Sequence, residues 1–534
     1  MKSQGSIAFT APHHLASATG FALLEQGASA IDAMIAAAAA ITVAYPHMNS
    51  LGGDGFWLIH APGEKPIAID ACGNAAALAD QDFYAGHSSI PTRGGPAALT
   101  MAGTLDGWRC AQEWQSQRGI ASRPLAELLA PALRMAEEGI VVTKSLQMAS
   151  EKVAADLAQL GAYQRVFCPA GRTLQEGDTL RNPGLARLLR VLSERGTDEF
   201  YRGDLAVELA RWLHANGSPL RAGDFAAYRA RIVDPLSVRV RAATIYNLPP
   251  PTQGLASLLI LGIYDRLEEK YQPQSEAEHL HLLVEAIKQA FVVRDKTICD
   301  PAHLAAGWDS HLTEEGVAAL AAAVDPKQAS PWPRVAKPGD TVWMGAVDGS
   351  GLMVSFIQSV YWEFGSGLVN EDYGLTWNNR GLSFSLDPEH VNTLRPGCKP
   401  FHTLNPAFAI FDDGRRLSYG TMGGEGQPQT QSAVFSRYAY QNLSLQEAIA
   451  RGRWLLGRTW GDSSHDLKLE ADLAEVAGEG LRALGHNFRV VPACNEMMGH
   501  AGAIALDADG AVEAATDPRS DGRAYARNAK QERK

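Results

Sequence analysis

The sequence predicts a layered α/β protein, in which helices cover a core of strands, from three observations. Apolar residues recur at helical spacing in the middle third, as at Leu280, Leu283 and Ile287. Residues 341–384 are rich in Val, Trp, Tyr, Phe and Gly, a composition typical of strands. A second strand–turn unit covers residues 407–426, and strands flanked by helices pack as layers.

The composition is that of a globular protein with a large core. The chain has 534 residues, of which 46 % are apolar and 20 % charged, so a mostly disordered chain is excluded. The formal charge is −11 and no Lys/Arg run is present, which argues against nucleic acid and anionic membranes as partners. The longest largely apolar stretch, residues 33–45, is too short to span a bilayer.

Cysteine usage and the first residues predict a cytoplasmic protein. The six cysteines are far apart and form no C-x-x-C, so neither a disulfide framework nor a zinc ribbon is expected. Residues 1–5 lead into no apolar segment of the kind found in a secretory signal. We therefore expect reduced thiols in the cytoplasm.

Familiar cofactor and metal motifs are absent from the sequence. There is no P-loop, no G-x-S-x-G and no H-E-x-x-H. His279 and His281 lie two positions apart in a helical segment and so do not face one another. The sequence thus predicts neither a cofactor nor a metal.

The first segment predicts a capped helix followed by a strand. Ser29 and Asp32 have the spacing of a capping box before the Ala-rich residues 33–44. The turn-forming residues 45–55 then lead into the strand-like residues 56–59.

A β-hairpin is predicted where the chain changes character near residue 340. Asp348-Gly349 is a strong turn signal, and a loop over residues 349–351 places Thr341 opposite Ser359. A two-residue loop would shift the pairing by one. Pairs of hydroxyl side chains on adjacent strands are common in sheets. Taken alone, this pair therefore indicates a structural contact and not a catalytic site.

Consecutive glycines follow the strand that ends near Thr421. Gly423 and Gly424 would let backbone N–H groups approach a ligand closely, as in an oxyanion hole. Alone, the pair favours a tight turn.

Taken together, these segments resemble the γ-glutamyltransferase family of N-terminal-nucleophile hydrolases over nearly the whole chain. Six pieces stand in the family's order. They are residues 27–33 (G-N-A-x-D-A in the family), residues 45–56 (E-P-H-x-S-G-I-G-G-G-G-F), residues 96–108, Pro249-Pro250-Pro251, residues 283–286, and Thr516-Asp517-Pro518-Arg519 (S-D-P-R).

The resemblance implies a four-layer αββα sandwich and a self-cleaving precursor. Cleavage between Asp340 and Thr341 would give a large fragment, residues 1–340, and a small fragment, residues 341–534. The two would stay associated as one intertwined catalytic domain.

The resemblance also assigns roles to the hydroxyls and glycines. Thr341 would be the nucleophile, with its freed α-amine, of pKa roughly 7.7–8, as the base. Ser359 would be the second hydroxyl that steadies the nucleophile. Gly423 and Gly424 would be the oxyanion glycines.

Departures from the family pattern concern the residues that hold a glutamyl group. The N-N-Q-x-x-D pattern becomes residues 378–383, with Arg380 for Gln and Ser383 for the Asp that binds an ammonium. Tyr361 replaces an Asn. In the segment that replaces the family's carboxylate clamp, His402 and Thr403 can still donate to a carboxylate.

These departures predict a small amide whose acyl part carries a carboxylate but no α-amine. The branch of the family that fits best hydrolyses oxamate, the half-amide of oxalic acid, to oxalate and ammonia in purine-ring catabolism. A glutaryl-type acylase and a γ-glutamyltransferase or glutathione hydrolase are the alternatives. An unprocessed binding or scaffold protein is the alternative without catalysis.

Overall fold

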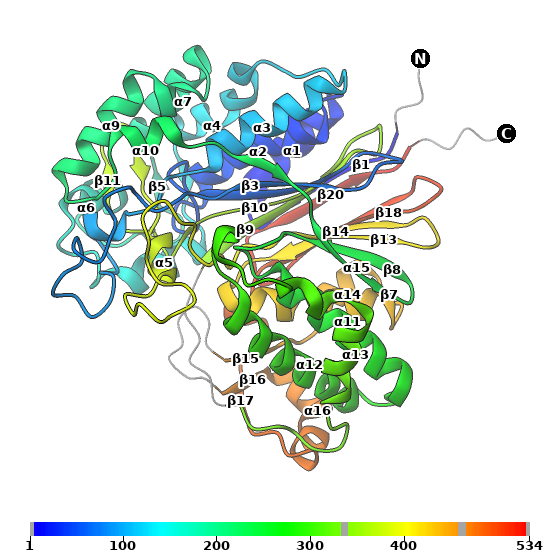
Figure 1. The fold of residues 1–534 in the computed structure, drawn as a ribbon. Coiled ribbons are helices and arrows are strands. Elements are labelled where there is room, and N and C mark those ends of the chain that lie inside the picture. The colour runs from blue at the N-terminus through cyan, green and yellow to red at the C-terminus, as the bar shows by residue number, and fades with distance from the viewer. Residues whose placement is uncertain (1–4, 333–339, 458–465, 530–534) are drawn as a thin grey trace.

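The fold is a four-layer sandwich of two β-sheets packed face to face between layers of helices (Figure 1). The computed structural model describes residues 5–332, 340–457 and 466–529. This architecture confirms the predicted αββα layers.

The first sheet has seven strands in the order β20-β1-β9-β10-β2-β3-β6. Strands from both sides of residue 340 alternate in it, because β9 and β10 lie between β1 and β2. The strands are β1 Ile7–Ala11, β2 Asp54–His60, β3 Ile67–Ala71, β6 Arg231–Val233, β9 Asp340–Val347, β10 Met353–Tyr361 and β20 Arg523–Arg527.

The second sheet has six strands in the order β19-β18-β14-β13-β8-β7. It too combines segments from both sides of residue 340, so neither the segment before that point nor the one after it has a sheet of its own. The strands are β7 Leu236–Val240, β8 Ala243–Asn247, β13 Ala407–Phe411, β14 Arg416–Thr421, β18 Ala501–Leu506 and β19 Val512–Thr516.

Helices before residue 230 cover the first sheet. Helices α1 to α3 contact its strands, and α4 and α7 form a further layer outside α2. The helices of this part are α1 His14–Glu25, α2 Ala30–Ala44, α3 Thr104–Gln117, α4 Leu125–Glu138, α5 Lys144–Val153, α6 Gly161–Phe167, α7 Pro183–Arg195, α8 Glu199–Arg202, α9 Asp204–Ala215 and α10 Ala222–Ala227.

Later helices cover the second sheet. Helices α11, α14 and α15 contact its strands, and α12 packs outside α11. These helices are α11 Gly254–Tyr271, α12 Glu276–Thr297, α13 Glu314–Ala322, α14 Gln427–Ala439, α15 Leu445–Ala450 and α16 Ala471–Ala483. Small sheets are formed by β4 Ile140–Val141 with β5 Thr179–Leu180, and by β15 Trp454–Leu456, β16 Leu467–Glu470 and β17 Phe488–Val491.

The core follows the four layers. One apolar cluster lies between the first sheet and its helices, a second between the second sheet and its helices, and a third between the two sheets. Trp343 is central to the third cluster, where its indole N–H donates to Ser355 Oγ at 2.9 Å. Gly420 and Gly502 give the indole room, since a Cβ at either would lie within 2.5 Å of it.

Local predictions are largely confirmed. Ser29 caps α2, its Oγ accepting the Asp32 N–H at 3.1 Å, and the predicted strand at residues 56–59 lies within β2. The prediction of strands over residues 341–384 is wrong beyond β10. There the chain forms only the two-residue strands β11 Val369–Asn370 and β12 Leu375–Thr376 and a 3₁₀ turn, Arg380–Ser383. Glycines with positive φ, such as Gly365 and Gly374, turn the backbone where the composition favoured extended chain.

All six cysteines are free thiols. Within the described ranges, none of the helices is both long and apolar enough to cross a membrane.

Candidate functional site

The hairpin formed by β9 and β10 brings Thr341 and Ser359 to the same end of the first sheet. The register that a three-residue loop predicts is confirmed from Met353 opposite Val347 to Gln358 opposite Val342. The ladder then shifts, and Tyr361 pairs with Asp340. Both hydroxyl-bearing residues therefore lie at a β-bulge, where extra residues re-aim side chains.

The bulge fixes the Ser359 hydroxyl. Ser359 Oγ accepts the Tyr361 N–H at 2.7 Å, and Tyr361 has a φ of 85°, which is rare for a non-glycine residue. Such a conformation persists only where the surroundings hold it in place, and it is frequent at functional sites. The Asp340 side chain and residues 333–339, before the predicted cleavage point, lie outside the described residues.

Thr341 lies against the amino-terminal end of α14. Its side chain is fully buried, and Gln427 Nε2, from the first residue of α14, donates to Thr341 Oγ1 at 3.4 Å. Gly423 and Gly424 precede this helix with φ values of 119° and 53°. Two consecutive positive φ angles favour glycine at both positions, and the adjacent helix end carries a partial positive charge.

Arg380 is a buried cation. Its side chain is 1 % exposed, its guanidinium carbon lies 3.8 Å from the centre of the Tyr361 ring, and its Nη1 donates to Thr403 Oγ1 at 3.1 Å. Nε and Nη2 are buried without a hydrogen-bond partner among the described residues. Burial lowers the pKa of Arg380 to about 10, so the side chain stays charged near neutral pH.

Asp54 and His402 form a buried pair close to Arg380. His402 Nε2 lies 3.0 Å from Asp54 Oδ2, and the Gly73 N–H donates to Asp54 Oδ1 at 2.9 Å. Burial raises the pKa of Asp54 to about 7, against the opposing effect of Arg380. Because the Leu404 N–H also donates to His402 Nδ1, both ring nitrogens are engaged within the protein, and a contact of His402 with substrate stays a prediction.

Gln253 joins the Arg380 region to the glycine turn. Its Nε2 donates to the carbonyl oxygens of Thr403 at 2.7 Å and Gly424 at 2.8 Å. Its Oε1 accepts from Arg294 Nη1 at 3.1 Å, and Arg294 Nη2 pairs with Glu425 at 2.6 Å. These contacts link the residues predicted for carboxylate binding to those predicted for the oxyanion.

A small cavity opens beside the site. It has a volume of about 200 Å³, and its lining includes Tyr361, Ser383, Phe401 and Glu425. Arg380 lies beneath the Tyr361 ring.

The nine predicted site residues thus lie in one neighbourhood. They are linked by the β-bulge, by the glycine turn at Gly423 and Gly424, and by the hydrogen bond between Arg380 and Thr403. Sequence reasoning missed Asp54, Gln253 and Gln427. The signal for Asp54 was available, since it is an acid within an otherwise glycine-rich segment. Gln253 and Gln427 carried no such signal, because their contacts bridge segments far apart in the chain.

Comparison with known proteins shows similarity over almost the full length. The family model described as Gamma-glutamyltranspeptidase matches residues 16–527. The oxamate amidohydrolase proenzyme of Klebsiella pneumoniae is 52 % identical over 96 % of this chain and 97 % of that protein. A glutathione hydrolase-like proenzyme of Bacillus subtilis is 36 % identical over 96 % of this chain and 97 % of that protein. Among solved structures, a cephalosporin acylase from Bacillus halodurans has a TM-score of 0.88 at 31 % identity, covering 98 % of this chain and 96 % of that one.

Proposed function

Because the chain belongs to the gamma-glutamyltranspeptidase family and is a hydrolase of amide C–N bonds, we propose that it uses Thr341 as an amino-terminal nucleophile on a small amide whose acyl part carries a carboxylate. Oxamate is the substrate that this proposal favours. Purine-ring catabolism in the cytoplasm is the corresponding context.

The nucleophile would be generated by cleavage between Asp340 and Thr341. A threonine hydroxyl is a weak nucleophile near neutral pH. The freed α-amine, with a pKa of roughly 7.7–8, is held beside Oγ1 by the covalent geometry of the residue and acts as its base. The Gln427 side chain orients Oγ1 by donating to it.

Hydrolysis would proceed in two balanced steps. Thr341 Oγ1 attacks the amide carbon, the C–N bond breaks, and ammonia leaves with the proton that the α-amine took from the hydroxyl. Water then hydrolyses the ester, giving oxalate and restoring the threonine. The glycine turn at Gly423 and Gly424, beside the end of α14, supports a role in stabilising the oxyanion in both steps.

The choice of substrate rests on the buried guanidinium of Arg380. A buried guanidinium with two unpartnered nitrogens, Nε and Nη2, is unfavourable until an anion pairs with it. A planar carboxylate matches the fork of a guanidinium, and Thr403 can donate a further hydrogen bond from its hydroxyl. A substrate ammonium would be repelled at this position.

The size and charge of the site separate oxamate from the alternatives. The bulky Tyr361 and Phe401 side chains line the cavity beside the site, and they leave less room for a glutaryl chain than for a two-carbon acid. Ser383 offers no charge to an α-ammonium, and Glu425 is paired with Arg294. A γ-glutamyl group is therefore disfavoured.

A substrate panel tests the proposal. Purified protein is assayed for ammonia or amine release from oxamate, oxamide, γ-glutamyl-p-nitroanilide and glutaryl-p-nitroanilide, with Thr341→Ala as the uncut, inactive control. We expect turnover of oxamate, with oxalate formed in equal amount, and little release from the γ-glutamyl compound. Efficient γ-glutamyl or glutaryl turnover with oxamate untouched would overturn the choice of substrate, and a single uncut inactive band for wild type would favour the scaffold alternative.

A further inference from the structure

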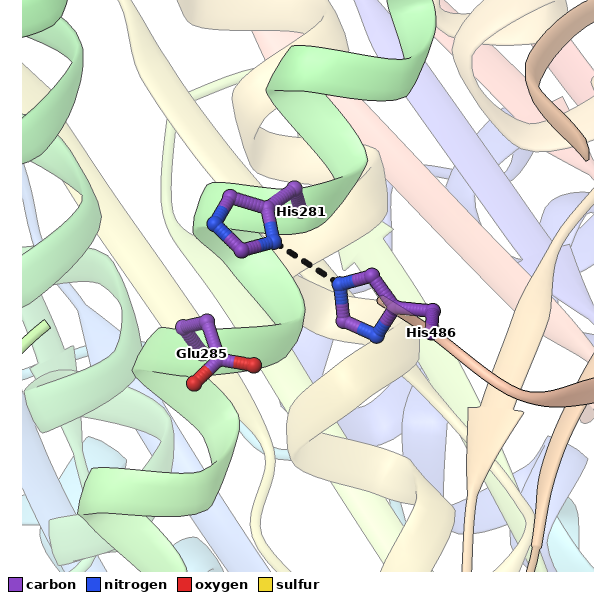
Figure 2. Close-up of side chains that lie close together, drawn as sticks. All are labelled: His281, Glu285 and His486. Carbon is purple, nitrogen blue, oxygen red and sulfur yellow. Dashed lines mark hydrogen bonds between the residues drawn. The ribbon is translucent and has the colours of Figure 1, made fainter. Parts of the chain in front are cut away.

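A second group of chemically active side chains lies away from the Thr341 site. Figure 2 shows a ring nitrogen of His281 pointing toward a ring nitrogen of His486, with Glu285 one turn further along α12. His281 Nδ1 lies 2.8 Å from His486 Nε2, and one ligand atom of each of the three residues lies within 4.8 Å of the others. All three side chains are buried.

The hydrogen bonds define which nitrogen carries a proton. His281 Nε2 lies 2.9 Å from the Asp325 carbonyl oxygen, which can only accept, so Nε2 is the donor. In the neutral ring Nδ1 then presents a lone pair toward His486. Metal-binding histidines are commonly oriented in this way, with the second ring nitrogen donating to a carbonyl or carboxylate.

From this arrangement we propose that His281, Glu285 and His486 bind a divalent transition-metal ion such as Zn²⁺. Two imidazole nitrogens and one carboxylate oxygen form a ligand set that such ions prefer over Mg²⁺ or Ca²⁺. Zn–N bonds of about 2.0–2.1 Å would place the two nitrogens about 3.3 Å apart, so the ion requires the rings to separate by about 0.5 Å. The His486 proton moves from Nε2 to Nδ1 when the ion replaces the hydrogen bond.

Lys288 is the cation that pairs with Glu285 in the described structure. Its Nζ donates to Glu285 Oε1 and to the Ser330 carbonyl oxygen, both at 2.6 Å. Lys288 and His486 also border a cavity of about 430 Å³, whose lining includes Asp466. The flexible ammonium can therefore turn into this cavity as the ion enters by the same route, and water can complete the coordination.

The site would join the two fragments of the processed protein. His281 and Glu285 precede residue 340, whereas His486 follows it. This consequence rests on the proposed cleavage, but metal binding does not. A bound ion would make separation of the fragments harder.

Metal titration tests the proposal without measuring catalysis. Chelator-stripped protein is titrated with Zn²⁺ by calorimetry and with Co²⁺ by visible absorption. We expect one ion per chain with a dissociation constant in the micromolar range or below. His486→Asn and Glu285→Gln should each weaken binding by more than about tenfold, the least that loss of even an outer partner of a metal ligand typically causes. His279→Asn is the matched control, because its ring lies on the same helix but bonds the Tyr264 hydroxyl.

Lys288→Met distinguishes a metal site from a purely structural network. It removes the competing cation, so Zn²⁺ should bind more tightly than to wild type. It also leaves the buried Glu285 carboxylate without a cation, with only the Ser330 N–H donating to it, so the melting temperature should fall without metal and recover when Zn²⁺ is added. Absence of stoichiometric binding to wild type, binding unchanged in both ligand variants, or no recovery in Lys288→Met would overturn the proposal. So would loss of binding in His303→Asn, which would assign the ion to the separate Asp300, His303 and Cys398 cluster.

Discussion

Replacing Arg380 with glutamine tests how the acyl group is recognised. The substitution removes Nε and Nη2, the two buried nitrogens that have no partner among the described residues. Charge-assisted hydrogen bonds contribute about 1.5–3 kcal/mol each, so losing two weakens carboxylate binding by at least about 3 kcal/mol. At about 1.4 kcal/mol per factor of ten, KM for oxamate should rise by about 100-fold or more.

The expected pattern is specific to the carboxylate. Self-cleavage of Arg380→Gln should be little changed, because the precursor presents no free substrate carboxylate. Oxamide, which lacks the charge, should be a poor substrate for wild type and nearly insensitive to the substitution. Arg118→Gln is the matched control, since Arg118, at the carboxyl end of α3, stacks 4.0 Å from the centre of the Trp114 ring and pairs with Glu64. It should leave KM unchanged.

Steady-state kinetics on the cut enzymes would measure these effects. A KM for oxamate within threefold of wild type in Arg380→Gln would refute the carboxylate-binding role. An equal loss on oxamate and oxamide would also refute it, because the effect would then not depend on the substrate charge.

Three further predictions concern the turn, the sheet packing and a buried acid. Gly423→Ala introduces a side chain at a φ of 119°, which should displace an oxyanion donor and lower kcat by about 100-fold or more. Gly426→Ala is the control, because its φ of −75° suits alanine, and it should change kcat little. Gly420→Ala places a Cβ 2.2 Å from the Trp343 ring and should lower the free energy of unfolding by about 1–3 kcal/mol in urea titrations, with slower self-cleavage; unchanged stability would contradict this packing. In the folded state the pKa of Asp54 is raised to about 7, against roughly 3.9 in the unfolded chain. Between these values the folded state holds one more proton than the unfolded state. The free energy of unfolding should therefore fall by up to about 1.4 kcal/mol per pH unit as the pH rises from 4 to 7. Asp54→Asn should flatten that slope in urea titrations across this range, and an unchanged slope would contradict the raised pKa.

The hairpin formed by β9 and β10 shows which features could be predicted from the sequence and which could not. Asp348-Gly349 predicted the turn, and the three-residue loop predicted the pairing as far as Val342 and Gln358. The shift after Gln358 depends on Tyr361 adopting a positive φ, which its residue type does not favour. A local pattern thus predicts the strands and their register but not the bulge at the end of the ladder.

The candidate site likewise has features that the sequence predicts and features that it does not. Arg380, Gly423 and Gly424 could be identified because each occupies a motif position. The lack of a partner for Arg380 Nε and Nη2 could not, because it depends on how segments far apart in the chain pack around the side chain. The pair of His281 and His486 was missed for a related reason. The two residues are 205 positions apart in the chain. Residue spacing along one helix tests His281 only against its neighbours in that helix, such as His279.

The amino-terminal sequence of the smaller fragment tests the central claim, that Thr341 becomes the nucleophile, most directly. Protein purified with its amidase activity should contain two fragments, and the smaller should begin Thr-Val-Trp-Met with a free threonine amine at residue 341. An active preparation whose smaller fragment begins at another residue, or which remains a single chain, would contradict the assignment of Thr341.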